Sequence, residues 1–292
     1  MAVYERHYSP YDGTVTPRKT RFLVLPAYSY KEILSSKMFL IFLAVWGVWA
    51  LLVIPILIYL PHNLGFIERF GLDPESLKGV FNYDAKFFFG WFMVPSMVVA
   101  YLSALVVGPA LVSADLRNNG LPLYLARPFG RWEYVLGKSA VMLILLSAIT
   151  WIPGLFLFAF QSYMEGWDWF SNNLGVAVGI FFTSWIWIAQ LCVISLALSA
   201  YLKWKPVARL SLILIFVVMP RIGDVINLIL STSWGSVMDL LKMTGVIATG
   251  MFGIPSRSAV PLPVAWLSLI VFCAVCVALM AKKVRAYEVV KS

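Results

Sequence analysis

Six runs of apolar residues, each long enough to cross a lipid bilayer, dominate the sequence. They extend over residues 38–60, 87–112, 139–160, 174–202, 208–230 and 262–280. An α-helix needs about 20 apolar residues to cross about 30 Å of hydrocarbon, and it pairs its own backbone polar groups while doing so. Charged residues make up 13% of the chain, half of the roughly 25% usual in a water-soluble domain. The sequence therefore predicts an all-α integral membrane protein with six transmembrane helices.

Lysine and arginine are distributed unevenly among the segments that flank these runs. Of the 23 Lys and Arg residues, 17 lie in the N-terminal arm, the connections after the second and fourth runs, and the C-terminal tail. Positive residues accumulate in cytoplasmic loops, so we predict that both termini are cytoplasmic. The chain then divides into a cytoplasmic arm (1–37), a transmembrane domain (38–281) and a cytoplasmic tail (282–292). This topology explains the net charge of +9, and we predict no nucleic-acid partner.

Three segments beside the spans have patterns of their own. The stretch 26–37 mixes aromatic and aliphatic residues with polar ones, which is typical of an interfacial helix before the first span; an irregular solvated arm is the alternative. The stretch 163–170 joins aromatic residues with two acids, as expected of a short outer loop. The stretch 234–255 is apolar but interrupted by charges and glycines. We interpret it as a re-entrant or interfacial piece on the outer face.

Several prolines fall within the predicted spans, among them Pro55, Pro95, Pro109 and Pro153. Each lacks the backbone N–H that would pair the carbonyl group four residues earlier. Membrane helices tolerate this where a neighbouring group pairs the freed carbonyl. We therefore expect kinks at these positions.

The connection between the second and third spans, 113–138, is charged, rich in turns and followed by Ser139. Its end, Gly137-Lys138-Ser139, matches the last residues of a phosphate-binding loop, which also requires a glycine five positions before the second glycine. Trp132 occupies that position here. A membrane helix, and not a strand, precedes the segment. We predict no nucleotide site in this chain.

The middle of the same connection has room for a short apolar helix between turn-forming residues. Gly120 and Pro122 lie before it, and the sequence Pro128-Phe129-Gly130 follows it. An apolar patch ringed by charges usually marks a protein contact, although it could equally pack against helix ends of this protein. The apolar residues are Leu121, Leu123, Tyr124 and Leu125, and the surrounding charges are Asp115, Arg117, Arg127 and Arg131.

This connection resembles the first cytoplasmic loop of the permease subunits of type-2 ATP-binding-cassette (ABC) exporters. The C-terminal stretch 282–290 is similar to the tail of that family, and the six-span plan agrees with it. One departure is Gly120-Leu121-Pro122, where many members carry Gly-Thr-Leu. The matching residues are Asp115, Arg117, Leu123, Leu125, Arg127, Pro128, Arg131, Tyr134, Gly137 and Lys138.

The resemblance implies that the chain is the membrane subunit of a bacterial inner-membrane exporter and is not itself an enzyme. Two copies of the chain would work with two copies of a cytoplasmic ABC ATPase, which would bind ATP and Mg²⁺, while this chain would hold no cofactor and no metal. A short coupling helix between spans 2 and 3 would transmit the movement of the ATPase. The residues that it implies for this contact are Asp115, Arg117, Gly120, Leu121, Pro122, Leu123, Tyr124, Leu125, Arg127, Pro128 and Arg131.

Two further pairs are candidates for other roles. Arg221 and Asp224 lie three residues apart near the outer end of the fifth span. Because charge in hydrocarbon is costly, they either line a wet substrate path or mark the end of that span. Gly175 and Gly179 form a G-x-x-x-G spacing that permits close helix packing.

No catalytic motif is present in the sequence. Cys273 and Cys276 share a helix face without a nearby His or acid, so we interpret them as small apolar residues. A membrane-embedded lipid-modifying enzyme would need a polar cluster at membrane depth. A secondary transporter usually has ionisable residues near the midplane. Both remain alternatives to the exporter subunit, and the substrate is not evident from the sequence.

Overall fold

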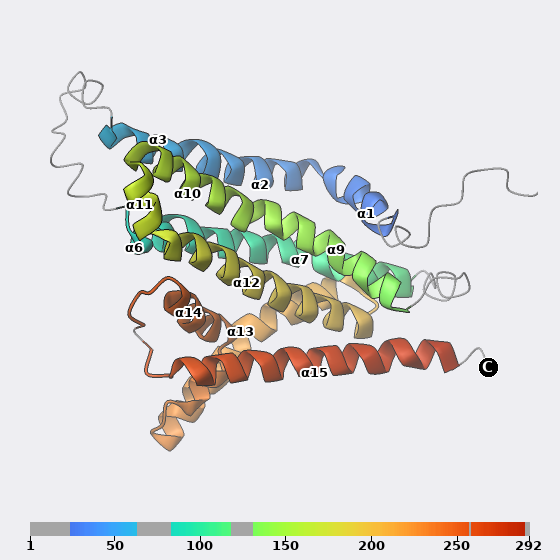
Figure 1. Ribbon diagram of the computed structural model, residues 1–292. Helices are drawn as coiled ribbons and strands as arrows, with labels where there is room; N and C mark the ends of the chain where they lie inside the picture. The colour runs from blue at the N-terminus through green and yellow to red at the C-terminus, as the bar shows by residue number, and fades with distance from the viewer. Residues whose placement is uncertain (1–23, 63–82, 118–130, 257, 290–292) are drawn as a thin grey trace, which may run out of the picture.

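The computed structural model describes residues 24–62, 83–117, 131–256 and 258–289, and the elements in these ranges are all helical (Figure 1). The helices long and apolar enough to cross a membrane are Lys37–Tyr59, Ala85–Pro109, Tyr134–Glu165, Leu174–Tyr201, Lys205–Leu230 and Leu262–Lys283. Each overlaps one of the six apolar runs. The prediction of an all-α fold with six candidate spans is confirmed.

Several spans are built from consecutive helical pieces. The first consists of α2 (Lys37–Val48), the π-helical turn η2 (Trp49–Val53) and α3 (Ile54–Tyr59), followed by the 3₁₀ turn η3 (Leu60–His62). The second consists of α6 (Ala85–Phe87), the π-helical turn η4 (Phe88–Met93) and α7 (Val94–Arg117). The third consists of α9 (Arg131–Ile149) and α10 (Trp151–Glu165). Short helix α11 (Trp167–Asn172) then leads into the fourth span.

The later spans are longer single helices. They are α12 (Leu174–Tyr201), α13 (Lys205–Leu230) and α15 (Leu262–Val289). Between α13 and α15 lie the 3₁₀ turn η5 (Trp234–Met238) and the short helix α14 (Leu240–Met251).

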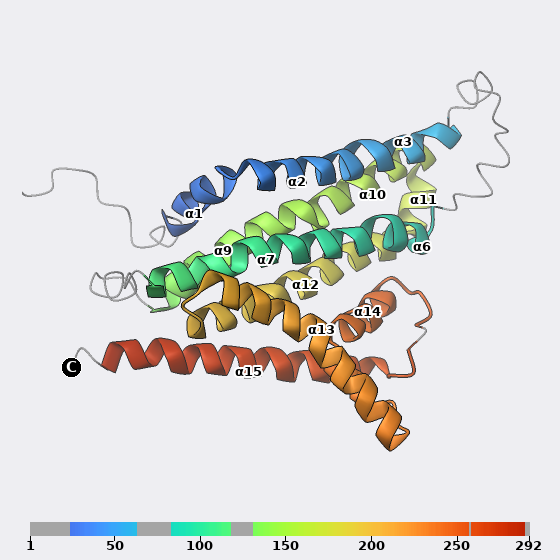
Figure 2. The same ribbon diagram turned by 180° about the vertical axis from the view of Figure 1, so that it is seen from behind.

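The two ends of the bundle differ in what they carry. Helix α1 (Val24–Leu34), the end of α7, the start of α9 and the C-terminal end of α15 lie together at one end, which we call the α1 end (Figures 1 and 2). Helices α3, α6, α11 and α14 lie at the other, which we call the α11 end. An even number of spans with both ends of the described chain on one side agrees with the predicted plan.

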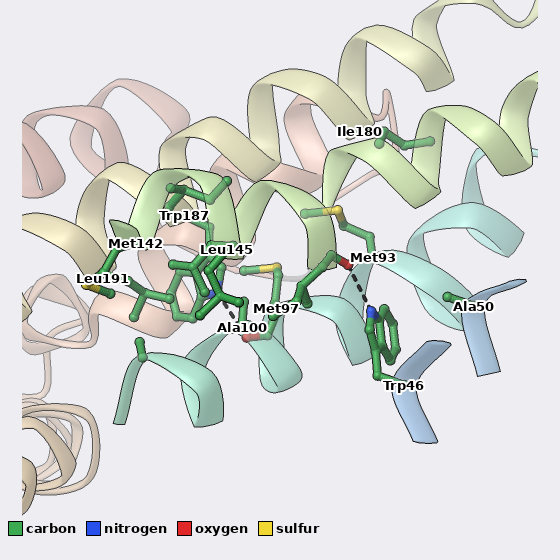
Figure 3. Close-up of a cluster of buried hydrophobic side chains, with 14 of the residues drawn as sticks. Trp46, Ala50, Met93, Met97, Ala100, Met142, Leu145, Ile180, Trp187 and Leu191 are labelled. Carbon is green, nitrogen blue, oxygen red and sulfur yellow. Dashed lines mark hydrogen bonds between the residues drawn. The ribbon is translucent and has the colours of Figure 1, made fainter. Parts of the chain in front are cut away.

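Helix α12 is the centre of the bundle. It packs against α7, α9, α10, α13, α14 and α15. Its Trp187 is buried, and the indole N–H donates to the backbone oxygen of Met97 at 3.0 Å. Figure 3 shows this indole among Met97, Ala100, Leu145 and Leu191, which come from three different spans.

Prolines in the spans leave carbonyl groups without a helical donor, and tryptophan and arginine side chains of neighbouring helices donate hydrogen bonds to these groups. The Trp46 indole donates to the Ile149 oxygen at 3.0 Å, and this oxygen lacks a helical partner because Pro153 follows four residues later. Trp49 donates to the oxygen of Trp91 at 3.3 Å, which Pro95 frees in the same way.

Pro109 frees the oxygen of Leu105, and Arg209 Nε of α13 donates to it at 3.0 Å. Side chains of neighbouring helices thus donate to the carbonyl groups that Pro95, Pro109 and Pro153 leave unpaired. Pro55 lies two residues after the π-helical turn η2, and Pro95 lies two residues after η4. π-helical turns are a common cause of helix bending.

Helix α1 precedes the first span and is packed on α9. The Tyr30 hydroxyl donates to the oxygen of Val141 at 2.6 Å, and burial raises the pKa of this phenol to about 12. The segment predicted as an interfacial helix (26–37) is therefore helical over most of its length and docked on the third span.

The segment between α13 and α15 folds back along the bundle. Asn227 Oδ1 accepts from the Gly235 amide at 2.7 Å, so η5 returns along α13. The Thr244 hydroxyl of α14 then donates to Gln190 Oε1 at 2.7 Å, about 24 Å along α12 from its start at 1.5 Å per residue. Helix α14 ends beside Gly179, near that start. The segment 234–255 therefore packs along α13 and α12.

Candidate functional site

The predicted coupling contact lies at the α1 end, where α7 and α9 converge. Helix α7 ends at Arg117 and α9 begins at Arg131. Residues 118–130 are outside the described residues, so the predicted coupling helix is not described by the structure. This holds for Gly120, Leu121, Pro122, Leu123, Tyr124, Leu125, Arg127 and Pro128. The side chains of Asp115, Arg117 and Arg131 are also outside the described part.

Three residues that carry the resemblance do fall in the described part of α9. Tyr134 is 3% exposed and Lys138 is 6% exposed, and Gly137 between them is buried. The Lys138 ammonium lies 5.8 Å from the centre of the Tyr134 ring, within reach of a cation–π interaction. One face of α9, with Tyr134, Gly137 and Lys138, is thus buried in the bundle, so a movement of this part of the helix has to be shared by its neighbours.

The contact between α7 and α12 has no spare room beside this junction. A Cβ atom added to Gly108 would lie 2.6 Å from Cβ and Oγ of Ser195, which is far inside van der Waals contact. The Ser199 hydroxyl donates to the oxygen of Gly108 at 3.0 Å. Helix α7 cannot slide on α12 here without breaking this hydrogen bond.

Helix α13 is connected to the same region through one side chain. Arg209 lies in the second turn of α13, and its bond to the Leu105 oxygen joins α13 to α7 one turn before Gly108. Because Pro109 leaves this carbonyl without a helical donor, the arginine is its replacement partner. The α7 segment Leu105–Pro109 therefore contacts both α12 and α13.

The predicted charged pair lies far from this junction, on the outward side of α13. Arg221 Nη1 and Asp224 Oδ2 are 3.6 Å apart, and the two side chains are 81% and 63% exposed. The helix continues to Leu230, so the pair does not mark the end of the helix.

A cavity near this pair does not include it. The cavity has a volume of about 440 Å³ and lies between α13, η5 and α15, lined by Met219, Val237, Phe272 and other apolar side chains. Ser268 is the one lining residue with a hydroxyl, and this hydroxyl donates to the oxygen of Val237 at 2.8 Å. The cavity suits a hydrocarbon chain and does not form a polar path past Arg221.

Of the predicted glycine pair, Gly179 lies in a close helix contact and Gly175 does not. A Cβ atom at Gly179 would lie 3.0 Å from the Phe252 ring and 3.2 Å from the oxygen of Met251. At Gly175, nothing in the described part of the chain would lie within 4 Å. The close approach thus occurs between α12 and the end of α14, and not between two spans.

Two features of the structure are not evident from the sequence. His62 Nε2 lies 3.1 Å from Glu165 Oε1 and joins the first and third spans at the α11 end. These residues are separated by 103 positions, and no local pattern relates them.

The second feature is a set of buried polar residues on α12. The sequence predicts few polar groups in the spans, whereas the structure buries several along this helix at 0–1% exposure. Successive members of this set are one, six, five and four positions apart, so they do not follow the spacing of one helix face and no sequence period identifies them. The residues are Thr183, Ser184, Gln190, Ser195 and Ser199.

Cys192, Cys273 and Cys276 are free thiols. Within the ranges that the structure covers, no three His, Cys, Asp or Glu side chains gather in a group that could hold a metal ion.

Comparisons with known proteins add no family to this picture. Neither the scan against protein-family models nor the search of curated proteins found a match to the chain.

Proposed function

We propose that this protein is the membrane-spanning subunit of an ATP-driven exporter, and that two copies work with two copies of a separate cytoplasmic ATPase. The observation that carries this proposal is the connection 113–138, whose residues resemble the ATPase-contacting loop of type-2 ABC permeases. Six candidate spans and a helix docked before the first of them are consistent with the same plan.

The proposed topology places the α1 end in the cytoplasm, at the inner membrane of a bacterium. The uneven distribution of Lys and Arg supports this orientation. The long connection 63–82 and the elements α11 and α14 then belong to the outer side. Helix α1 would lie at the inner membrane surface, with Tyr30 holding it to the third span.

The proposed mechanism uses the rigid contacts around Gly108. When the ATPase pair closes on ATP, the connection between α7 and α9 moves. Helix α7 passes this movement to α12 through the Gly108–Ser199 contact, and to α13 through Arg209. Packed interfaces of this kind shift between discrete arrangements because their cores do not deform continuously.

Co-expression with a candidate ABC ATPase, sought first in the neighbouring reading frames, tests the proposal. We expect the two proteins to co-purify, and Leu123→Asp or Tyr124→Asp to release the ATPase while membrane insertion persists. Trp167→Asp, at an exposed position of the α11 end, is the matched control and should leave the complex intact.

Transport assays in liposomes separate the exporter from its alternatives. The exporter subunit should stimulate ATP hydrolysis by its partner when cargo is present. Transport by the isolated chain, driven by an ion gradient without any ATPase, would instead identify a secondary transporter. Chemical conversion of lipid by the isolated chain would identify an enzyme.

A further inference from the structure

Helix α13 carries a stripe of exposed side chains at heptad spacing. Its members, Leu210, Leu214, Val217, Arg221, Asp224 and Leu228, alternate at steps of four and three residues. Such spacing places side chains on one face of an α-helix, as in the seam between two coiled helices. The four apolar members are 45–81% exposed. We call this set the α13 stripe.

The opposite face of α13 is fixed against the protein. Gly223 is buried against the backbone of Gly235, and Asn227 bonds the amide of Gly235 and the hydroxyl of Ser236. These contacts set the rotation of the helix, so the α13 stripe points away from the bundle. Figures 1 and 2 show the far half of α13 standing clear of the other spans.

Apolar exposure alone does not identify a protein contact in a membrane. Lipid chains are as apolar as leucine, so Leu214 facing lipid needs no protein partner. Arg221 and Asp224 differ, because lipid cannot pair them. They follow Lys205 by about 24–29 Å along the helix at 1.5 Å per residue, and apolar residues continue to Leu230. The pair therefore lies on an apolar helix with hydrocarbon-type residues on both sides of it.

Within one copy of the chain, Arg221 and Asp224 do not form a close hydrogen bond with each other. The Nη1–Oδ2 distance of 3.6 Å is longer than the roughly 2.7–2.9 Å of a charge-assisted hydrogen bond. In a parallel pair with two-fold symmetry equal positions face each other, so each arginine can reach the aspartate of the other copy diagonally, in the adjacent layer of the seam. An interface with two-fold symmetry is self-complementary in this way.

We propose that the α13 stripe is the contact surface for a second copy of this chain, with Arg221 of each copy paired to Asp224 of the partner subunit. The two α13 helices run parallel and cross as a short coiled seam, with Leu210, Leu214 and Val217 forming its apolar layers. This interface rests on the proposed two-copy assembly and names its surface.

Disulfide cross-linking in native membranes tests the surface directly. The three native cysteines are first replaced by alanine, and Leu214→Cys is introduced alone. Facing positions of a parallel seam bring two Cα atoms within the 4.4–6.8 Å that a disulfide needs, so oxidation should give a covalent dimer. Ile270→Cys on α15, 58% exposed, is the matched control and should remain monomeric.

Charge exchange tests the pairing. Arg221→Asp alone gives the seam acidic groups only, and Asp224→Arg alone gives it basic groups only. Each should lower the Leu214→Cys cross-link yield by about tenfold or more, since like charges in contact cost several multiples of RT. The double exchange, Arg221→Asp with Asp224→Arg, should restore the yield. Equal yields for all four charge combinations would overturn the pairing.

The cross-linking and ATPase assays can refute the interface and the exporter assignment independently of each other. If Leu214→Cys stays monomeric while the chain still stimulates its ATPase, the α13 stripe is not the interface and the exporter assignment stands. If Leu214→Cys cross-links and Ile270→Cys does not, but no ATPase co-purifies, the interface stands and the exporter assignment fails. Cross-linking of Ile270→Cys to the same yield would show random collision and overturn the interface.

Discussion

Helices α12 and α13 are both long, apolar spans, yet they occupy opposite environments. The two helices are similarly apolar, whereas 56% of the most apolar stretch of 18 residues is buried in α12 and 11% in α13. Hydropathy therefore identifies a span without showing where it lies in the bundle. The difference resides in side-chain size and polarity, since α12 buries serine, threonine, glutamine and glycine, and α13 exposes leucine and valine. Small and weakly polar residues let helices approach closely where lipid supplies no driving force.

The largest effect should come from adding bulk to the tight contact of α12. Gly108→Val places atoms where Ser195 already lies, and overpacking of this kind costs about 1–3 kcal/mol or more. We expect a clear loss of thermal stability of the purified protein in detergent. Gly175→Val on α12 adds the same atoms to open space and is the control; equal losses for both would refute the packing described for Gly108.

The next largest difference should appear when one leucine on each helix is truncated to alanine, because the loss of stability depends on how deeply the leucine is buried. Leu191→Ala on α12 removes a side chain with 0% exposure and leaves a cavity, which costs about 2 kcal/mol or more. Leu214→Ala on α13, 45% exposed, leaves space that lipid fills and should cost less than about 0.5 kcal/mol in the single chain. Denaturant titration of the two variants in detergent micelles measures this difference, and a reversed order would show that α13 is the better packed helix.

The pairing of prolines with side-chain donors predicts a specific coupling. Trp46→Phe leaves the Ile149 oxygen unpaired, at a cost of about 1–3 kcal/mol. In a Pro153→Ala background, the new backbone N–H can pair that oxygen, so the same substitution should cost about 1 kcal/mol less. A double-mutant cycle measured by unfolding gives the coupling directly. Strict additivity would mean that the tryptophan does not act through this carbonyl.

Removal of the side-chain donor beside Pro109 should have a smaller effect on stability than the loss of Trp46, and it should also lower activity. Arg209→Met removes the donor to the Leu105 oxygen, which we expect to cost about 1 kcal/mol and to weaken ATPase stimulation by loosening α13 from α7. Pro109→Ala should restore the stability of Arg209→Met without restoring the connection to α13. Recovery of both properties together would show that Arg209 serves the carbonyl alone.

The six spans and the role of the prolines could be predicted because each depends on local sequence. A run of about 20 apolar residues and a missing backbone donor both have fixed consequences in lipid. The partners of the freed carbonyls could not be predicted, since Trp46 lies 103 positions from Ile149 and Arg209 lies 104 from Leu105. The contact of His62 with Glu165 escaped prediction for the same reason.

The α13 stripe shows a different limit. Its heptad spacing is present in the sequence, but equally spaced leucines also occur on helices that face lipid. Arg221 and Asp224 are exposed on the outward face of a helix that continues beyond them. This exposure distinguishes the α13 stripe from leucines that merely face lipid, and it is a property of the fold. The alternatives of a wet path and a span end were the ones that residue types alone allowed.

The central claim is that the connection between the second and third spans is where a separate ATPase attaches. A photoreactive amino acid placed at position 124, in cells that express the chain with the candidate ATPase, tests this contact within the intact membrane. The account predicts a cross-linked product that contains the ATPase from Tyr124, and none from a probe at Trp167 of the α11 end. An ATPase adduct from Trp167, or none from Tyr124 while the complex still co-purifies, would contradict it.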